Sequence, residues 1–130
     1  MKISVIKKIS CDVNVEKVEE SVKIVLMKNG APKDSEISTA ITSDEELEEL
    51  AARYMGESGE EAKSHPVLSF SSKEVKDFIV PKESKNYLGE IMISWEKAVI
   101  ESKKFDRSAE DIVCDYAAHA TLHLLGIHHK

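Results

Sequence analysis

Hydrophobic and polar residues alternate in four short segments of the chain, a pattern typical of β-strands that bury one face. ISVIKKI alternates strictly, and SEISTAIT carries β-branched residues at alternate positions. VLSF and EIMISW are short apolar runs, and the YLG before the second supplies a glycine suited to a turn. The predicted strands span residues 3–9, 35–42, 67–70 and 90–95.

Between the first three strands and after the last one, the chain carries residues typical of helix starts and helix ends, which predicts helices. Asn14 is suited to cap the first helix, and Gly30 to end it. Ser43 is suited to cap the second. Ser108 is suited to cap the last helix, and Gly126 to end it. The predicted helices span residues 15–29, 44–55, 96–105 and 109–125, with a polar loop over 57–66.

The resulting order, β-α-β-α-β-β-α-α, predicts an α+β fold in which helices cover a small mixed four-stranded sheet. The 130 residues, 42% of them hydrophobic, are enough for one domain over 1–130 with a substantial core. No apolar run reaches the ~18–20 residues of a membrane span, and the lysine-rich MKISVIKKIS lacks the apolar region of a secretory signal. Cys11 and Cys114 are distant in sequence, so we expect two free thiols and a cytoplasmic protein.

The net charge of −6 is concentrated in one part of the chain. Residues 44–62 contain eight acidic residues and one basic residue, so the remainder of the chain is close to neutral. This acidic segment reads as one solvated helix face followed by a loop. Charge therefore neither supports nor excludes a polyanionic substrate.

The segment HATLHLLGIHH contains four of the five histidines. His119 and His123 are four residues apart on the last predicted helix, so both rings leave one face within reach of a single metal ion. Gly126 permits the positive φ that ends a helix and reverses the chain. Either His128 or His129 can then return to the same point. The spacing His-x3-His-x5-His is that of a three-histidine zinc site with a fourth position open for water.

A histidine pair at this spacing also occurs on surfaces that bind nothing. Leu122, Leu124 and Leu125 are interleaved with the histidines, which predicts a buried helix whose neutral imidazoles require partners. A metal ion supplies such partners, so we predict Zn²⁺ binding. The spacing also resembles the metzincin pattern, but Ala120 replaces its general-base glutamate, which excludes a peptidase of that class.

HATLHLLGIHH resembles the H-G-x-L-H-L-x-G-Y-D-H signature of the YbeY family of bacterial rRNA maturation factors. VLSF is similar to that family's T-D-V-L-S-F strand, LGEIMIS to its L-G-D-I-x-I-S strand, and ITSDEELEELAARY to its D-x-E-I-x-x-L-N-x-x-Y segment. The resemblance covers residues 35–129 and implies an α+β fold. It implies zinc ligation by His119, His123 and His129, with His128 in the place of the family's aspartate.

The resemblance also implies a single-strand-specific endoribonuclease that acts in ribosomal RNA processing and ribosome quality control. The implied partners are single-stranded RNA, ribosomal RNA and the small ribosomal subunit, with no membrane partner and a monomeric protein. The sequence departs from the pattern where Met55 replaces the arginine after the aromatic residue, a natural stabiliser of phosphate charge. His65-Pro66 replaces T-D, and Ala120 replaces the motif glycine. We therefore expect a weakened activity.

Beyond the metal ligands, the sequence assigns no catalytic residue but offers three candidates: Ser69, Arg53 and Asp115. Ser69 either points into a cleft or packs as an ordinary strand hydroxyl. Asp115 lies one turn before His119 and either orients its imidazole or faces water. The candidate phosphate contacts are Arg53, Lys73 and Arg107.

Two other functions fit the same residues. One is a zinc-stabilised ribosome-binding factor that cleaves nothing, in which His128 or Cys114 closes the metal site as a fourth ligand. The other is hydrolysis of a small molecule on the same scaffold.

Overall fold

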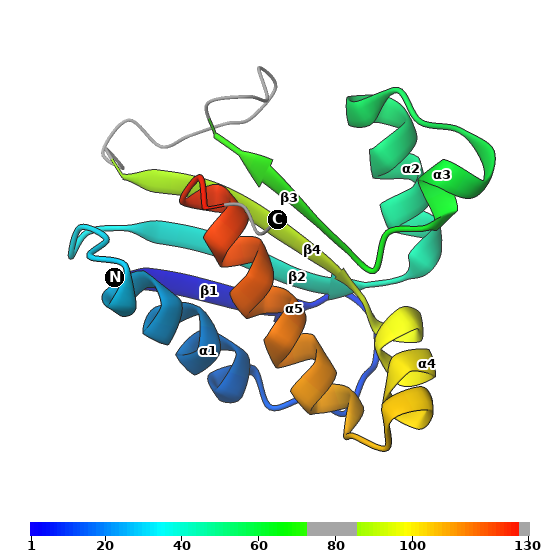
Figure 1. The fold of residues 1–130 in the computed structure, drawn as a ribbon, viewed down its shortest axis with the longest axis horizontal. Helices are drawn as coiled ribbons and strands as arrows, with labels where there is room; N and C mark the ends of the chain where they lie inside the picture. The colour runs from blue at the N-terminus through cyan, green and yellow to red at the C-terminus, as the bar shows by residue number, and fades with distance from the viewer. Residues whose placement is uncertain (73–85, 128–130) are drawn as a thin grey trace.

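The computed structural model describes residues 1–72 and 86–127. Within them the chain forms five helices and a four-stranded sheet (Figure 1). The predicted α+β fold with a small four-stranded sheet is confirmed. The elements are β1 (Lys2–Lys7), α1 (Val15–Lys28), β2 (Glu36–Thr42), α2 (Asp44–Met55), α3 (Gly59–Lys63), β3 (Val67–Ser71), β4 (Tyr87–Ser94), α4 (Trp95–Phe105) and α5 (Ala109–Leu124).

The strands lie in the order β1-β2-β4-β3. β1, β2 and β4 are parallel, and β3 pairs antiparallel with β4 at the edge of the sheet. The sheet is therefore mixed, as predicted. None of the helices in the described part of the chain is long and apolar enough to cross a membrane.

Hydroxyl and amide side chains begin the four longer helices, as the sequence predicts for three of them. The side chains of Asn14, Ser43 and Ser108 accept hydrogen bonds from backbone N–H groups of α1, α2 and α5. Ser94 does the same for α4, so the last residue of β4 is also the cap of the next helix. These bonds satisfy N–H groups that the helix itself leaves without partners.

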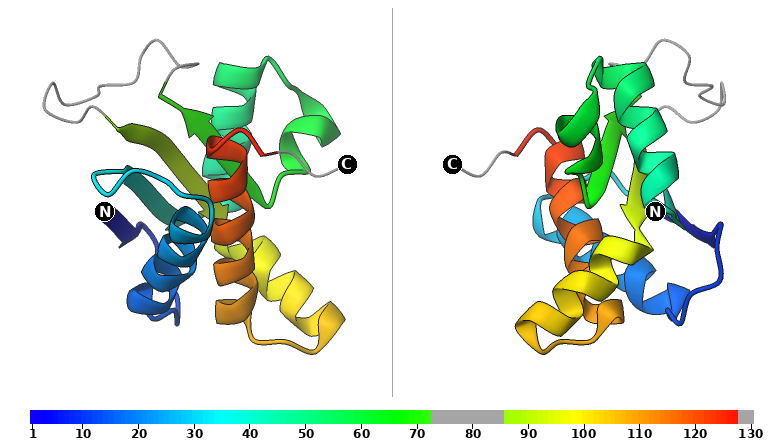
Figure 2. Two further views of the ribbon diagram at one scale, coloured as in Figure 1. Left: turned by 60° about the vertical axis from the view of Figure 1, so that its left-hand side comes forward. Right: turned by 90° about the vertical axis from the view of Figure 1, so that its right-hand side faces the viewer.

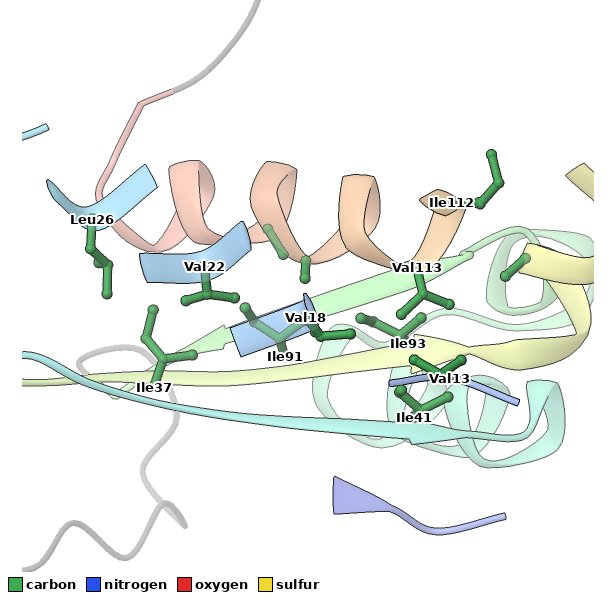
Figure 3. Packing of buried hydrophobic residues seen from close by; sticks show 13 residues of the cluster. Val13, Val18, Val22, Leu26, Ile37, Ile41, Ile91, Ile93, Ile112 and Val113 are labelled. Carbon is green, nitrogen blue, oxygen red and sulfur yellow. The ribbon is translucent and has the colours of Figure 1, made fainter. Parts of the chain in front are cut away.

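The larger hydrophobic cluster lies between one face of the sheet and the helices α1 and α5 (Figures 1 and 2). Val18, Val22 and Leu26 of α1 lie over Ile37 of β2 and Ile91 of β4 (Figure 3). All five are at most 1% exposed. Burial of each such side chain contributes about 1.5–3 kcal/mol, so this layer holds α1 firmly against the sheet.

A smaller cluster lies on the opposite face of the sheet, where α2 and α3 cover β3 and β4 (Figure 2). Alternate residues of each strand point to the two faces, which is why Ile91 belongs to the first cluster and Met92 to the second. The members of the second cluster are Ala40, Leu47, Ala51, Ala62, Leu68, Phe70 and Met92.

The short helix α3 lies in the segment that the sequence predicts to be a polar loop. Five residues are too few for a helix to be stable alone. Ala62 is 3% exposed and packs into the second cluster. Tertiary packing therefore holds this turn, and local polarity could not reveal it.

Gly89 lies within β4, not in the predicted turn before it. Its φ is +148°, and a Cβ atom at this position would lie 2.1 Å from the carbonyl oxygen of Phe70 and 3.0 Å from Cδ2 of Leu124. The glycine therefore allows the neighbouring strand and the end of α5 to approach the backbone closely.

Candidate functional site

The last turns of α5 present two histidines to solvent. Ala117, Ala120 and Thr121 are the buried side of this part of the helix, whereas His119 and His123 are exposed. The expectation that the histidines are buried was wrong: their face of α5 is exposed, and Leu122, Leu124 and Leu125 are only partly buried. The need of a buried imidazole for a partner therefore does not explain this pair.

The two imidazoles nevertheless converge. Nε2 of His119 and Nε2 of His123 are 3.0 Å apart, and the ring centroids are separated by 4.6 Å. Two nitrogen ligands bound to one tetrahedral Zn²⁺ at 2.0–2.1 Å lie about 3.3 Å apart. The observed geometry is close to this value, so the pair fits two positions around one metal ion.

The helix ends immediately after the pair, at the glycine that the sequence predicts. Gly126 has φ +80°, its N–H donates to the carbonyl of His123, and the N–H of Ile127 donates to the carbonyl of Leu122. This pattern ends a helix with a left-handed residue. His128 and His129 lie outside the described residues, so the third ligand stays a prediction. Within residues 1–72 and 86–127 no group of three or more metal-binding side chains converges.

Ser69 lies on the α5 side of β3. Its neighbours Leu68 and Phe70 belong to the second cluster, and its cross-strand partner Ile91 belongs to the first. β3 also packs against α5 (Figure 1). The structure therefore places Ser69 on the same side of the sheet as the histidine pair, and its side chain is partly exposed.

Arg53 and Met55 belong to α2, which packs on the other face of the sheet. The guanidinium of Arg53 lies 5.9 Å from the ring centroid of Tyr54. It also lines a hollow of about 640 Å³ beside Glu46 and Glu49. The sheet separates α2 from α5, so the structure does not bring Arg53 to the histidine pair.

Asp115 and Arg107 bind each other. Nη1 of Arg107 donates to Oδ2 of Asp115 over 2.5 Å, and the aspartate side chain is 59% exposed. This hydrogen bond and the nearby carboxylate raise the pKa of Arg107 above its ordinary value. The alternative in which Asp115 faces water is the one that the geometry favours. Lys73 lies outside the described residues.

Both cysteines are free thiols, as predicted. Burial is the main cause that raises the pKa of Cys114, while a hydrogen bond with Ser21 of α1 opposes the increase. Burial likewise raises the pKa of Cys11. Because Cys114 contacts α1 and the first cluster, its thiol does not point to the exposed side where the histidines lie.

One polar pair in the connection between α2 and β3 was not expected from the sequence. Nε2 of His65 lies 2.5 Å from Oε1 of Glu57, and this contact ties the link after α2 to the start of β3. Tyr54 packs edge-on against Phe70 at 5.6 Å between centroids in the same region. His65 and Glu57 are eight positions apart, and α3 lies between them. No local sequence pattern therefore indicates the pair.

The fold and the histidine pair define a small α+β protein with a two-histidine arrangement suited to a metal ion, presented beside an edge strand. The chain belongs to the YbeY family, described as Endoribonuclease YbeY, which matches residues 4–130. The resemblance seen in the sequence motifs is thus confirmed over nearly the whole chain.

Relatives in this family are similar along most of their length. The Endoribonuclease YbeY of Roseiflexus castenholzii is 30% identical over 128 residues, which is 98% of this chain and 78% of the relative. That of Caldicellulosiruptor bescii is 32% identical over 124 residues, 94% of this chain and 78% of the relative. The solution structure of TM1509 from Thermotoga maritima has a TM-score of 0.59 at 19% identity and covers 98% of this chain and 75% of that one, which supports the fold.

Proposed function

We propose that this protein is a zinc-dependent endoribonuclease that cleaves single-stranded RNA, in ribosomal RNA processing and ribosome quality control at the small ribosomal subunit. The observation that carries the proposal is the 3.0 Å separation of the His119 and His123 nitrogens on the exposed face of α5. Membership of the YbeY endoribonuclease family supports it. His129 is the proposed third ligand, because the three-histidine spacing and the family pattern both select it, and Gly126 ends the helix shortly before it.

Zn²⁺ bound by these histidines would supply a Lewis acid that activates water and polarises a phosphodiester oxygen. The chain itself positions the metal-binding histidines. The pair stands on the exposed side of a helix whose other side is buried against the sheet, so substrate reaches it from solvent. Ser69 is on the same side of the sheet and offers a hydroxyl that can donate to a phosphate oxygen.

The proposal is tested by incubating zinc-loaded and zinc-free protein with single-stranded and duplex RNA of the same sequence. We expect about one Zn²⁺ per chain and cleavage of the single strand by the loaded protein alone. His123→Ala should lose both metal and cleavage. His65→Ala removes a histidine whose partner is Glu57 and should keep both, which makes it the matched control.

Two results would contradict the proposal. Equal zinc content in His123→Ala and the unmodified protein would exclude the pair as the metal site. Cleavage that survives both chelation and His119→Ala would identify a contaminating nuclease.

The exposed Met55 favours a second function, a zinc-stabilised ribosome-binding factor without cleavage. Met55 stands where the family pattern has an arginine and is 49% exposed. Loss of one donor that stabilises transition-state charge costs about 10²–10³ in rate. The family pattern therefore predicts weak cleavage. Because α2 packs on the other face of the sheet from the histidine pair, Met55→Arg should leave kcat/KM on single-stranded RNA unchanged.

Substitution at an exposed helix end should leave folding intact, so the rate reports on charge alone. Met27→Arg, at a similarly exposed position on α1, is the control for a nonspecific gain of positive charge. No cleavage by folded, zinc-loaded protein, with or without Met55→Arg, would favour the binding factor.

A further inference from the structure

The outer surface of α4 exposes large apolar side chains. Ile100 is 62% exposed and Phe105 is 57% exposed. Ala98, on the inner side of the same helix, is fully buried in the first cluster. Ile100 and Phe105 therefore lie outside the hydrophobic core.

Two lysines stand beside these apolar side chains. Lys103 and Lys104 follow Ile100 by three and four residues and therefore share its face of the helix. Nζ of Lys104 lies 5.5 Å from the ring centroid of Phe105. Among the ion pairs of the described residues, neither lysine takes part, whereas the nearby Lys97 binds Asp44 and Arg107 binds Asp115.

The largest concentration of acidic residues lies on elements other than α4. The eight acidic residues of the segment 44–62 lie on α2, on α3 and in the connection between them, at the second face of the sheet. α4 joins α5 at the opposite end from the histidine turn (Figure 2). Exposed cations with an adjacent aromatic ring are the features with which proteins hold the phosphates and bases of a single strand.

We propose that Ile100, Lys103, Lys104 and Phe105, here termed the α4 patch, are a second contact for single-stranded RNA. This inference rests on the proposed function and extends it to the way in which substrate is held. The two lysines contact phosphates, and a base stacks on Phe105. From Ala109 to the histidines, α5 spans ten to fourteen residues, or about 15–21 Å, so one extended strand can reach both places.

The test measures RNA affinity as a function of salt for zinc-free protein, with an oligonucleotide of about 12 nucleotides, in the size range of single-strand sites. Each phosphate contact to a single strand contributes about 0.7 to the slope of log affinity against log salt. Lys103→Gln with Lys104→Gln should lower that slope by about 1.4. Phe105→Ala should weaken binding by about 5-fold or more through lost stacking.

The matched controls lie on α1, where Lys23, Lys28 and Met27 are also exposed. Lys23→Gln with Lys28→Gln removes the same charge and should leave the slope unchanged. Met27→Ala removes a side chain that is 62% exposed, close to the 57% of Phe105, and should leave affinity unchanged. Equal effects of the α1 and α4 variants would overturn the proposal, because net charge would then explain both.

Cleavage of a trinucleotide distinguishes a failure of this proposal from a failure of the proposed function. It is too short to span the two sites, so the α4 variants should raise KM for the longer RNA and leave trinucleotide cleavage unchanged. Unchanged KM for the longer RNA, with cleavage intact, would refute the patch and leave the nuclease standing. Loss of RNA affinity in the α4 variants of a protein that cleaves nothing would support the patch and refute the nuclease. Preferential binding of an acidic protein instead of RNA would refute the patch as an RNA contact.

Discussion

Gly89 is the residue that sets how closely the end of α5 approaches the sheet. Its missing side chain leaves room for the Phe70 carbonyl and for Leu124, which directly follows His123. Any Cβ atom here would push against backbone, which cannot move aside as a flexible side chain can. The position of the histidine pair therefore depends on a residue that contains no functional group.

Gly89→Ala should lower the free energy of unfolding by about 2–4 kcal/mol, because it combines a steric overlap with an unfavourable φ. Urea denaturation measures the loss. Gly30→Ala is the matched control: Gly30 also has positive φ, at +68°, but nothing lies within 4 Å of its would-be Cβ. It should cost only about 1 kcal/mol. Equal losses in the two variants would show that conformation alone, without the overlap, accounts for the effect.

The adjacent histidines beyond Gly126 should differ in their effect on metal affinity. The three-histidine spacing and the family pattern both select His129, with His128 in the place of an aspartate. His129→Ala should weaken Zn²⁺ binding by more than the 10–100-fold typical of an outer-sphere partner, and His128→Ala by that amount or less. Competitive zinc titration measures both. The reverse order would move the third ligand by one residue.

At the scale of secondary-structure elements, a polar network joins the ends of the parallel strands to α2 and α4. Ser94 donates to Asp44, which also pairs with Lys97 at 3.2 Å. Thr42 donates to Glu46 over 2.5 Å, and Lys8 binds the same carboxylate. Hydrogen bonds to charged groups contribute more than neutral ones, so this network fixes the start of both helices against the sheet.

Glu46 and Glu90 should give opposite dependences of stability on pH. Burial by itself would raise the pKa of Glu46, but the bonds from Lys8 and Thr42 outweigh it and lower the pKa below 4.5. Its contribution is therefore present above pH 4.5 and is lost as pH falls through the lowered value. Glu46→Gln should reduce stability by about 1–2 kcal/mol at pH 7 and by less in acid.

Glu90 provides the internal comparison. Burial raises its pKa above 4.5, only partly opposed by Lys8, so ionisation of Glu90 weakens the fold as pH rises through the raised value. The change in free energy of unfolding caused by Glu90→Gln should therefore be more favourable at pH 7 than at pH 4. Urea unfolding of the Glu46→Gln and Glu90→Gln variants at pH 4 and pH 7 measures both effects. Parallel pH profiles of the two variants would contradict the assigned environments.

At the scale of the whole molecule, periodicity and capping residues predicted most elements, because those signals are local. Asn14, Ser43 and Ser108 were recognisable as caps from their neighbours alone. The pairing of β2 with β4 was not predictable, since Ile37 and Gly89 are far apart in sequence. The helix α3 and the role of Gly89 depend on contacts of the same distant kind.

In the candidate site, too, local features were predictable from the sequence and long-range ones were not. Helical spacing placed His119 and His123 on one face, and the structure brings their nitrogens together. Spacing could not show that this face is exposed, because burial depends on where α1 and the sheet lie around α5. Nor could it show that α2, with Arg53 and Met55, is on the other side of the sheet.

The strand order β1-β2-β4-β3 also restricts the order in which the chain can fold. After β2 the chain leaves the sheet through α2 and α3, and β3 has only β4 as a neighbour. β3 therefore cannot join the sheet until residues synthesised after it have paired with β2. Such non-local pairing is slow to form. The edge strand nearest the histidine helix therefore depends on β4 for its place in the sheet, and the surface that would receive substrate exists only when β4 has paired with β2.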